Sequence, residues 1–290
     1  MHDRPTERDP PRSPLAAAWQ ACFEREPATF AVGLRLTTIA VVLWLSLEID
    51  LRWAHLPKGE VVSVAGLLVP ETWWSAPAAL WAGRAALWGG ALLWLHGRWR
   101  RLGAWSTTLG MLWLGSLYWE DLPWFRHKMV PPFWLLVLLV AAEHARVTDR
   151  RGLAPRWVRE GAVFALAAFY VGAGAQKLLA SGLRWGDGVA LQLWLERLGD
   201  RDSLVRAWVI ENASVAALLA SVALALELAV ALAVPLPRLR PWLAAAIIAL
   251  HVGIDRVLHI DFRSNIVLVA VVLLPWPNWV GASRRILFKG

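Results

Sequence analysis

The chain has little cysteine, tyrosine and lysine. It contains one cysteine and two tyrosines among 290 residues, and Cys22 alone can form neither an internal disulfide nor a multi-cysteine zinc or iron–sulfur site. Only four of the thirty basic residues are lysines, namely Lys58, Lys128, Lys177 and Lys289. No basic stripe with interleaved aromatic residues lies on a soluble element, so we do not expect nucleic acid as a partner.

Apolar residues and tryptophan are abundant. Hydrophobic residues make up 58% of the chain and the mean hydropathy is +0.46, which is too apolar for an ordinary soluble domain. Many of the 21 tryptophans flank apolar runs, as in the aromatic belts of membrane proteins. The lipid bilayer is therefore the first expected partner.

Eight apolar runs are long enough, or nearly so, to cross a bilayer as helices. The third, fourth and eighth are short, and the runs lie at 30–51, 76–95, 103–118, 131–144, 161–180, 214–234, 241–258 and 264–276. An amphipathic segment at Val189–Leu198 predicts a helix along the membrane interface. The expected fold is an all-α, polytopic integral membrane helix bundle of about eight transmembrane helices plus this interfacial helix.

The charge distribution gives the expected domains and orientation. We expect a cytoplasmic tail at 1–28, a transmembrane domain at 29–277 and a second cytoplasmic tail at 278–290. With both termini inside, 17 of the 26 basic residues in loops and tails face the cytoplasm, as the positive-inside rule requires. The predicted location is a cell membrane, as a multi-pass protein of the inner membrane type.

One lysine stands inside an apolar segment. Tyr170, Gly174, Lys177 and Ser181 recur at i, i+4, i+7 and i+11, so they share one helical face. A charged side chain at the bilayer centre costs roughly 2.5–3.5 kcal/mol, which makes Lys177 a candidate functional residue. The alternative is a lysine that reaches the lipid headgroups from near a helix end.

The motif of Tyr170, Gly174, Lys177, Trp185 and Gly188 resembles the signature of the HTTM (horizontally transferred transmembrane) family, which includes the vitamin K-dependent gamma-carboxylase. The resemblance covers most of 28–276. It implies that Lys177 acts as a base on reduced vitamin K, with a reduced quinone as cofactor. It also implies a site histidine before the fourth span, at His127, a histidine in the next-to-last region, at His251 or His259, and a structural Arg35.

The carboxylase continues past its helices into a lumenal, mainly β domain that helps bind its protein substrate. The last apolar run of the present sequence is followed by only fourteen residues, so carboxylation of protein glutamates is not expected.

Several other polar residues fall within or beside apolar runs. His251, Asp255 and His259 have i, i+4, i+8 spacing and could bind a metal, relay protons or form ion pairs; pairing is the commoner outcome inside membranes, so no metal is expected. Glu227 needs a partner, for which Arg84 and Lys177 are the candidates. Conversely, we predict that Arg84 and Arg256 find acidic or histidine partners within the bundle, with Glu227 and Asp255 as the favoured candidates.

Two hypotheses of function follow. In the first, the chain is a membrane enzyme with an outward-facing pocket for a quinone or lipid-like molecule, in which Lys177 is the general base and His127 is a second catalytic residue. The residues expected to bind the substrate are Tyr170, Gly174, Trp185, Gly188, His251 and His259. In the second, the chain is a non-catalytic scaffold, carrier or subunit of a membrane or periplasmic partner. A catalytic Lys177 must face a cavity, stand away from any permanent carboxylate and lose its proton well below its reference pKa of ~10.4.

Reporter fusions test the predicted orientation. A cytoplasmic reporter fused at Gly290 should be active, and a periplasmic reporter fused after Leu122 should be active, because the positive-inside rule places these points on opposite sides. Activity of the periplasmic reporter at Gly290 would overturn the topology and move Lys177 to the other face of the membrane.

Overall fold

The computed structural model describes residues 20–49, 77–118, 123–145, 153–199, 201–258 and 260–276, which are almost entirely helical. The longer helices are α2 (Thr29–Glu48), α5 (Pro77–His96), α6 (Arg100–Tyr118), α7 (Pro123–His144), α8 (Trp157–Ser181), α11 (Ala213–Ala229), α12 (Arg240–Leu258) and α13 (Arg263–Leu273). Shorter elements are the helices α9 (Val189–Leu198) and α10 (Leu204–Glu211), the 3₁₀ helices η2 (Gly182–Asp187), η3 (Val230–Ala233) and η4 (Pro237–Leu239), and the strands β1 (Arg25–Pro27) and β2 (Leu153–Pro155).

The eight longer helices coincide with the eight predicted apolar runs. Four helical segments in the described part of the chain are long and apolar enough to cross a membrane, namely Thr29–Glu48, Trp157–Asp187, Ala213–Ala233 and Pro237–Leu258. The amphipathic helix predicted at Val189–Leu198 is present as α9 with the same bounds. The described part of the chain is therefore almost entirely helical and compatible with a membrane protein.

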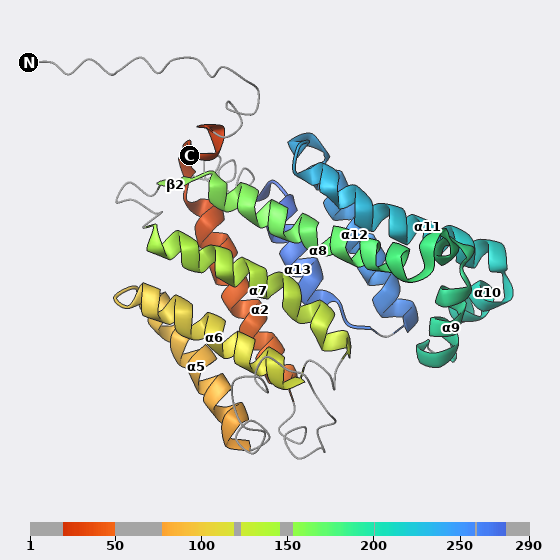
Figure 1. The fold of residues 1–290 in the computed structure, drawn as a ribbon, viewed down its shortest axis with the longest axis horizontal. Coiled ribbons are helices and arrows are strands. Elements are labelled where there is room, and N and C mark those ends of the chain that lie inside the picture. Colours follow the sequence, from red (N-terminus) through yellow and green to blue (C-terminus); the bar gives the residue numbers. More distant parts are fainter. Residues whose placement is uncertain are drawn as a thin grey trace, which may run out of the picture.

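The bundle is arranged around α2, α8 and α13 (Figure 1). Helices α5, α6 and α7 form a layer on one side, with α7 packed against both α2 and α8. On the other side, α11 packs against α8 and α12 packs against α13, and α9 and α10 cover that end. The main apolar core is continuous through α2, α7, α8 and α13 and includes the buried Leu34, Leu136, Leu166 and Leu268.

Helix α7 begins earlier than the sequence indicates. Its apolar run predicts that Pro131 and Pro132 start the fourth span, but α7 starts at Pro123 and both prolines lie inside it. Because proline has no N–H, the carbonyl oxygens four residues earlier, on His127 and Lys128, lose their helical hydrogen-bond donors. Neighbouring helices make such interruptions tolerable in membrane helices.

A short strand pair joins the N-terminal segment to the bundle. Strand β1 pairs antiparallel with β2, and Arg159 forms an ion pair with Glu26 at 3.1 Å. Burial raises the pKa of Glu26, although the nearby Arg159 and Arg156 oppose that change. The folded structure therefore includes residues that the sequence analysis assigned to the tail at 1–28; residues 1–19 and 277–290 lie outside the described part.

Glycines bring α5 and α6 into backbone contact. A Cβ atom on Gly90 would lie 2.5 Å from the Thr107 nitrogen, and one on Gly103 would lie 2.4 Å from the Trp94 nitrogen. Real Cβ atoms do not approach backbone so closely, hence these positions require glycine. Such small-residue contacts are a common means of helix association in membranes. Gly89, by contrast, has nothing within 4 Å of its Cβ position.

The contrast between these neighbouring glycines gives a matched test. Gly90→Ala should separate α5 from α6 and destabilise the protein by about 1–3 kcal/mol, as overpacking does. Gly89→Ala should be neutral or stabilising by up to about 1 kcal/mol, because alanine favours helix. Thermal unfolding midpoints in detergent measure both, and equal midpoints for the two variants would contradict the close α5–α6 contact.

Candidate intramembrane polar site

Lys177 pairs with Glu227 across the contact between α8 and α11. The Lys177 ammonium donates to Oε1 of Glu227, and the two side chains are 24% and 12% exposed. Gly174, one turn before Lys177, makes the approach feasible, because a Cβ there would lie 2.9 Å from Leu228 and 3.4 Å from the Glu227 Cβ. The lysine thus reaches back along α8 to a carboxylate, which confirms one of the two partners predicted for Glu227.

Tyr170 and His251 form a second polar contact beside this pair. The Tyr170 hydroxyl lies 2.6 Å from Nε2 of His251, and both residues are buried. The His251 ring also stacks on Phe262, with 4.5 Å between ring centroids. Glu227 is close enough to Tyr170, and Lys177 to His251, for charge to act between them. These four residues, which we call the Tyr170 cluster, join α8, α11 and α12.

The remaining motif residues hold η2 against the same helices. The Trp185 ring lies over the Lys177 ammonium, 5.4 Å from Nζ to the ring centroid. Gly188 ends η2 with φ +84°, and a Cβ there would lie 2.4 Å from the Ala217 nitrogen of α11. Since L-residues rarely adopt this conformation, Gly188 is fixed by both backbone angle and space. All five motif residues therefore lie at the contacts of α8 and η2 with α11 and α12.

Two buried atoms of the Tyr170 cluster have no hydrogen-bond partner. They are Oε2 of Glu227 and Nδ1 of His251. If the Tyr170 hydroxyl donates to Nε2, the proton of a neutral imidazole resides on Nδ1 and lacks an acceptor. Buried polar atoms are nearly always satisfied in proteins. The cluster accordingly offers one carboxylate acceptor and one ring N–H donor.

The ion pair bears directly on Lys177 as a base. A catalytic amine must stand away from any carboxylate, and Lys177 instead contacts Glu227. An adjacent negative charge favours the protonated form of lysine. The geometry therefore shows an ion-paired lysine and not the isolated amine that a general base requires.

No family model, curated protein or solved structure in our comparisons matches the chain. The resemblance to the HTTM family consequently rests on the motif residues themselves, and their convergence in space is an independent observation about them.

The predicted partners of Arg84 and Arg256 were wrong. The Arg84 guanidinium donates to the carbonyl oxygens of Ser46, at 3.0 Å, and of Ile49. The end of α2 offers free carbonyls and the negative end of the helix dipole, which serve a guanidinium as well as a carboxylate does. Arg256 is exposed near the end of α12, and neither it nor Asp255 forms an ion pair with another residue in the described part.

Two of the histidines that the sequence predicts for the site have side chains outside the described part of the structure. The side chain of His127 and the whole of His259 lie outside the described residues. Within the residues that the structure describes, no three histidine, cysteine or acidic side chains are grouped as metal ligands would be. Of the two described residues with this spacing, His251 lies in the Tyr170 cluster and Asp255 does not.

Sequence reasoning missed a charged cluster that ties three segments together. The Lys128 ammonium donates to Glu48 at 2.8 Å and to Asp261 at 3.3 Å, and Arg263 also pairs with Asp261 at 2.9 Å. Burial alone would raise the pKa of Asp261, but hydrogen bonds from Arg263 and Lys128 lower it to about 2. Its stabilising effect is therefore complete above the ordinary pKa of 3.8 and is lost as pH falls through about 2.

Two further ion pairs lie near the other helix ends. Arg240 binds Glu160 at 2.5 Å and the Ala233 carbonyl at 2.9 Å, which fixes the start of α12 beside α8. Arg35 pairs with Glu143 of α7 at 3.2 Å, in agreement with the structural role expected of Arg35.

A double-mutant cycle tests the Lys177–Glu227 pair. Lys177→Met and Glu227→Gln should each destabilise the protein by up to about 3 kcal/mol, because each leaves one buried charge without its partner. The double variant should lose less than the sum, giving a coupling of about 0.5–3 kcal/mol. The measurement is the unfolding free energy in detergent.

The exposed Arg263–Asp261 pair provides the control, through Arg263→Gln, Asp261→Asn and the double variant. Its coupling should be the smaller of the two, since Arg263 is exposed and solvent screens surface pairs. Strictly additive effects at Lys177 and Glu227 would show that the two residues do not interact.

Proposed function

We propose that this chain is an HTTM-type membrane protein that binds the polar end of a quinone-like molecule at the Tyr170 cluster. The observation that carries the proposal is the pair of buried, unpartnered atoms, Oε2 of Glu227 and Nδ1 of His251, in a cluster whose other polar atoms are satisfied internally. We also propose eight spans with both termini in the cytoplasm.

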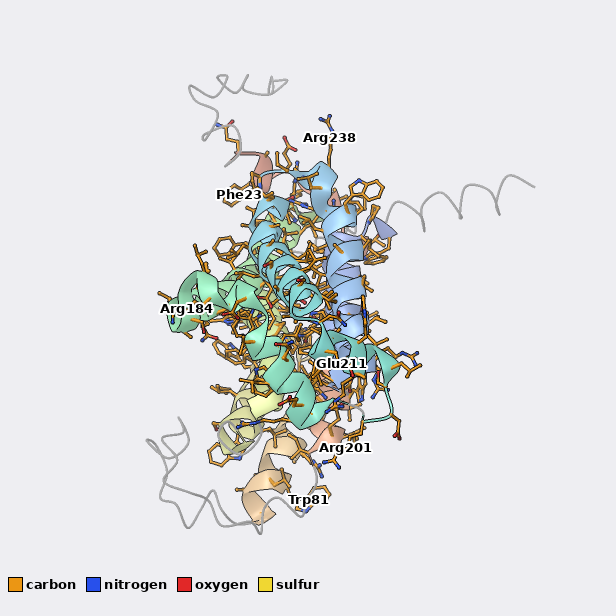
Figure 2. All side chains as sticks on the ribbon, turned by 90° about the vertical axis from the view of Figure 1, so that its right-hand side faces the viewer. Phe23, Trp81, Arg184, Arg201, Glu211 and Arg238 are labelled. Carbon is orange, nitrogen blue, oxygen red and sulfur yellow. The ribbon has the colours of Figure 1, made fainter. Side chains whose placement is uncertain are left out.

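The arrangement of helix ends supports this topology. Figure 2 places Phe23 and Arg238 toward one end of the molecule and Trp81 and Arg201 toward the other. The positive-inside count assigns the first two residues to the cytoplasmic side and the last two to the outer side.

The chemistry of the two free atoms matches a quinone and its reduced form. A quinone presents carbonyl acceptors, which an imidazole N–H can satisfy. A quinol presents hydroxyl donors, which a carboxylate oxygen can accept.

Lys177 has a different role in this proposal than in the carboxylase. Because the Lys177 ammonium donates to Glu227, the group able to accept a proton from a ligand is the Glu227 carboxylate. Lys177 then orients the carboxylate and supplies charge, while Trp185 covers the ammonium on the other side.

A second candidate function is a non-catalytic scaffold or partner subunit. The observation that favours it is that each motif residue has a structural role: Gly174 and Gly188 permit helix contact, and Lys177 joins α8 to α11. In that case the motif stabilises the bundle, and its polar residues bind no ligand.

Binding of menadione and of its reduced form separates the two functions. The full chain in nanodiscs should bind both saturably, as measured by thermophoresis. The paired change Lys177→Met with Glu227→Leu removes the free oxygen without leaving a net charge, and should weaken binding of the reduced form by about tenfold or more, the loss expected for a hydrogen bond to a charged group. His251→Phe should weaken binding of the oxidised form.

Two controls complete the experiment. Arg263→Gln, outside the cluster, should leave binding unchanged. Lys177→Arg keeps the ion pair but cannot become neutral, so it should bind both forms normally; loss of a ligand-dependent reaction in this variant alone would restore Lys177 as a base. If the protein shows no saturable binding, or if all variants bind equally, the ligand-binding function is rejected and the scaffold function is favoured.

A further inference from the structure

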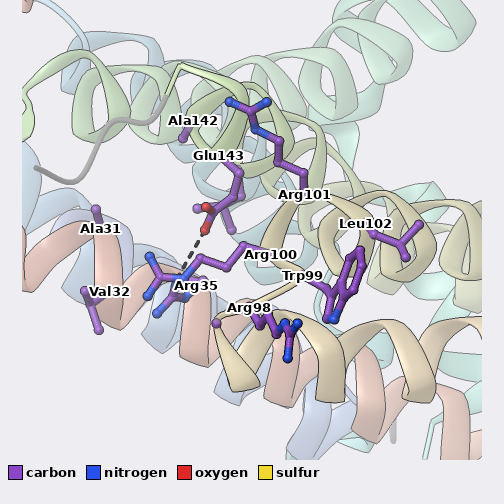
Figure 3. A pocket seen from close by; sticks show the side chains of 12 residues that line it. Ala31, Val32, Arg35, Arg98, Trp99, Arg100, Arg101, Leu102, Ala142 and Glu143 are labelled. Carbon is purple, nitrogen blue, oxygen red and sulfur yellow. Dashed lines mark hydrogen bonds and ion pairs between the residues drawn. The ribbon is translucent and has the colours of Figure 1, made fainter.

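A cavity of about 590 Å³ lies among the start of α2, the turn between α5 and α6, and the end of α7. It shares no residue with the Tyr170 cluster. Its lining combines arginines with apolar side chains. Figure 3 shows Arg35 paired with Glu143, and Arg98, Arg100 and Arg101 on the facing segment. The turn that carries three of these arginines bends at Gly97, whose φ of +87° suits glycine alone among ordinary residues.

The cavity has a marked excess of positive charge. Four arginines and one glutamate line it, so its net formal charge is +3. Glu143 cannot neutralise more than one arginine, because its Oε1 already accepts from Arg35, at 3.2 Å, and from the buried Trp94, at 2.8 Å. The α6 helix begins at Arg100, so the positive end of its dipole also lies at this cavity.

Several guanidinium groups here lack an anionic partner. The Nε of Arg35 is buried without any hydrogen-bond acceptor. Within the described part of the chain, Arg100 makes no ion pair, and Arg98 lies 5.9 Å above the Trp99 ring without a carboxylate. Arg101 donates only to the backbone carbonyl of His144. Guanidinium groups in a fixed arrangement are the preferred ligands of phosphate oxygens.

The apolar part of the lining indicates the kind of phosphate. Val32, Trp99 and Leu102 line the cavity and are 37%, 53% and 56% exposed. These apolar surfaces contribute nothing to the binding of a free phosphate ion, whereas the acyl chains of a lipid can pack along them. The positive-inside count places this end of the bundle on the cytoplasmic side, where anionic lipids are enriched and basic pockets between helices bind their headgroups.

We propose that this cavity binds the phosphate group of an anionic phospholipid from the cytoplasmic leaflet. Arg98 and Arg100 contact the phosphate oxygens, the unpartnered Nε of Arg35 donates from the floor of the cavity, and the acyl chains lie against Val32, Trp99 and Leu102. A bound lipid would also join α2, the α5–α6 hairpin and α7 at this end.

Native mass spectrometry of the full chain tests the proposal. The protein is released from micelles supplemented with phosphatidylglycerol or with phosphatidylcholine. Phosphatidylglycerol should be retained and phosphatidylcholine should not. The double change Arg98→Gln with Arg100→Gln should reduce the apparent affinity for phosphatidylglycerol by about tenfold or more, since each arginine near a membrane surface contributes roughly a fivefold change. Both side chains are exposed, and unfolding midpoints verify the fold.

The matched control changes Arg184 and Arg238 to Gln. These exposed arginines lie outside the cavity, and their loss alters the net charge equally, so retention should stay at the wild-type level. Val32→Trp, which narrows the cavity without changing charge, should also reduce retention. Equal losses in the cavity and control variants would reduce the effect to net charge and overturn the site.

A further arm distinguishes the source of the phosphate. Inorganic phosphate at millimolar concentration, added without anionic lipid, should not raise the unfolding midpoint of the wild type. A rise that disappears in the Arg98 and Arg100 double variant would show a site for free phosphate and overturn the lipid proposal. The result is independent of menadione binding at the Tyr170 cluster, so the two proposals fail separately.

Discussion

The ion pair between Lys177 and Glu227 is the interaction on which the second half of the bundle depends. A charge in an apolar helix must be paired, since an isolated buried charge loses hydration that nothing recovers. The pair therefore fixes one register of α11 along α8, with Gly174 allowing the helices to approach. That register positions Trp185 of η2 against the Lys177 ammonium and leaves α12 placed so that His251 contacts Tyr170.

Charges elsewhere are satisfied by different means, and the differences matter for function. Arg84 uses the carbonyl groups at the end of α2, Arg240 uses Glu160 and a carbonyl, and Lys128 lies between two carboxylates. At the Tyr170 cluster the formal charges of Lys177 and Glu227 cancel, so what remains for a ligand is hydrogen bonding. At the Arg35 cavity the charges do not cancel, which suits an anion. The unsatisfied hydrogen-bonding atoms of the Tyr170 cluster therefore match a neutral polar ligand, and the excess positive charge of the cavity matches an anion.

Much of the helical architecture could be predicted because apolar runs must bury their backbone polar groups internally. The bounds of α9 agreed with its amphipathic pattern, and α12 began within one residue of its predicted run. The start of α7 could not be predicted in this way, because Pro131 and Pro132 usually open a helix and only packing shows that one continues through them. The strand pair of β1 with β2 had no sequence pattern at all, since each strand has three residues.

By itself, the sequence indicated a helical protein of membrane type and identified Lys177 as the one lysine inside an apolar run, because hydropathy, spacing and composition are local properties. Only the tertiary structure decided which partner each charged side chain binds. Lys177 pairs with Glu227 and does not face a free cavity, and Arg84 binds backbone carbonyl groups and not Glu227. It also decided that Arg35, which looked like an isolated residue of α2, lines a cavity with the α5–α6 turn. Partner choice depends on the depth and register of helices far apart in the chain, and no local pattern encodes those distances.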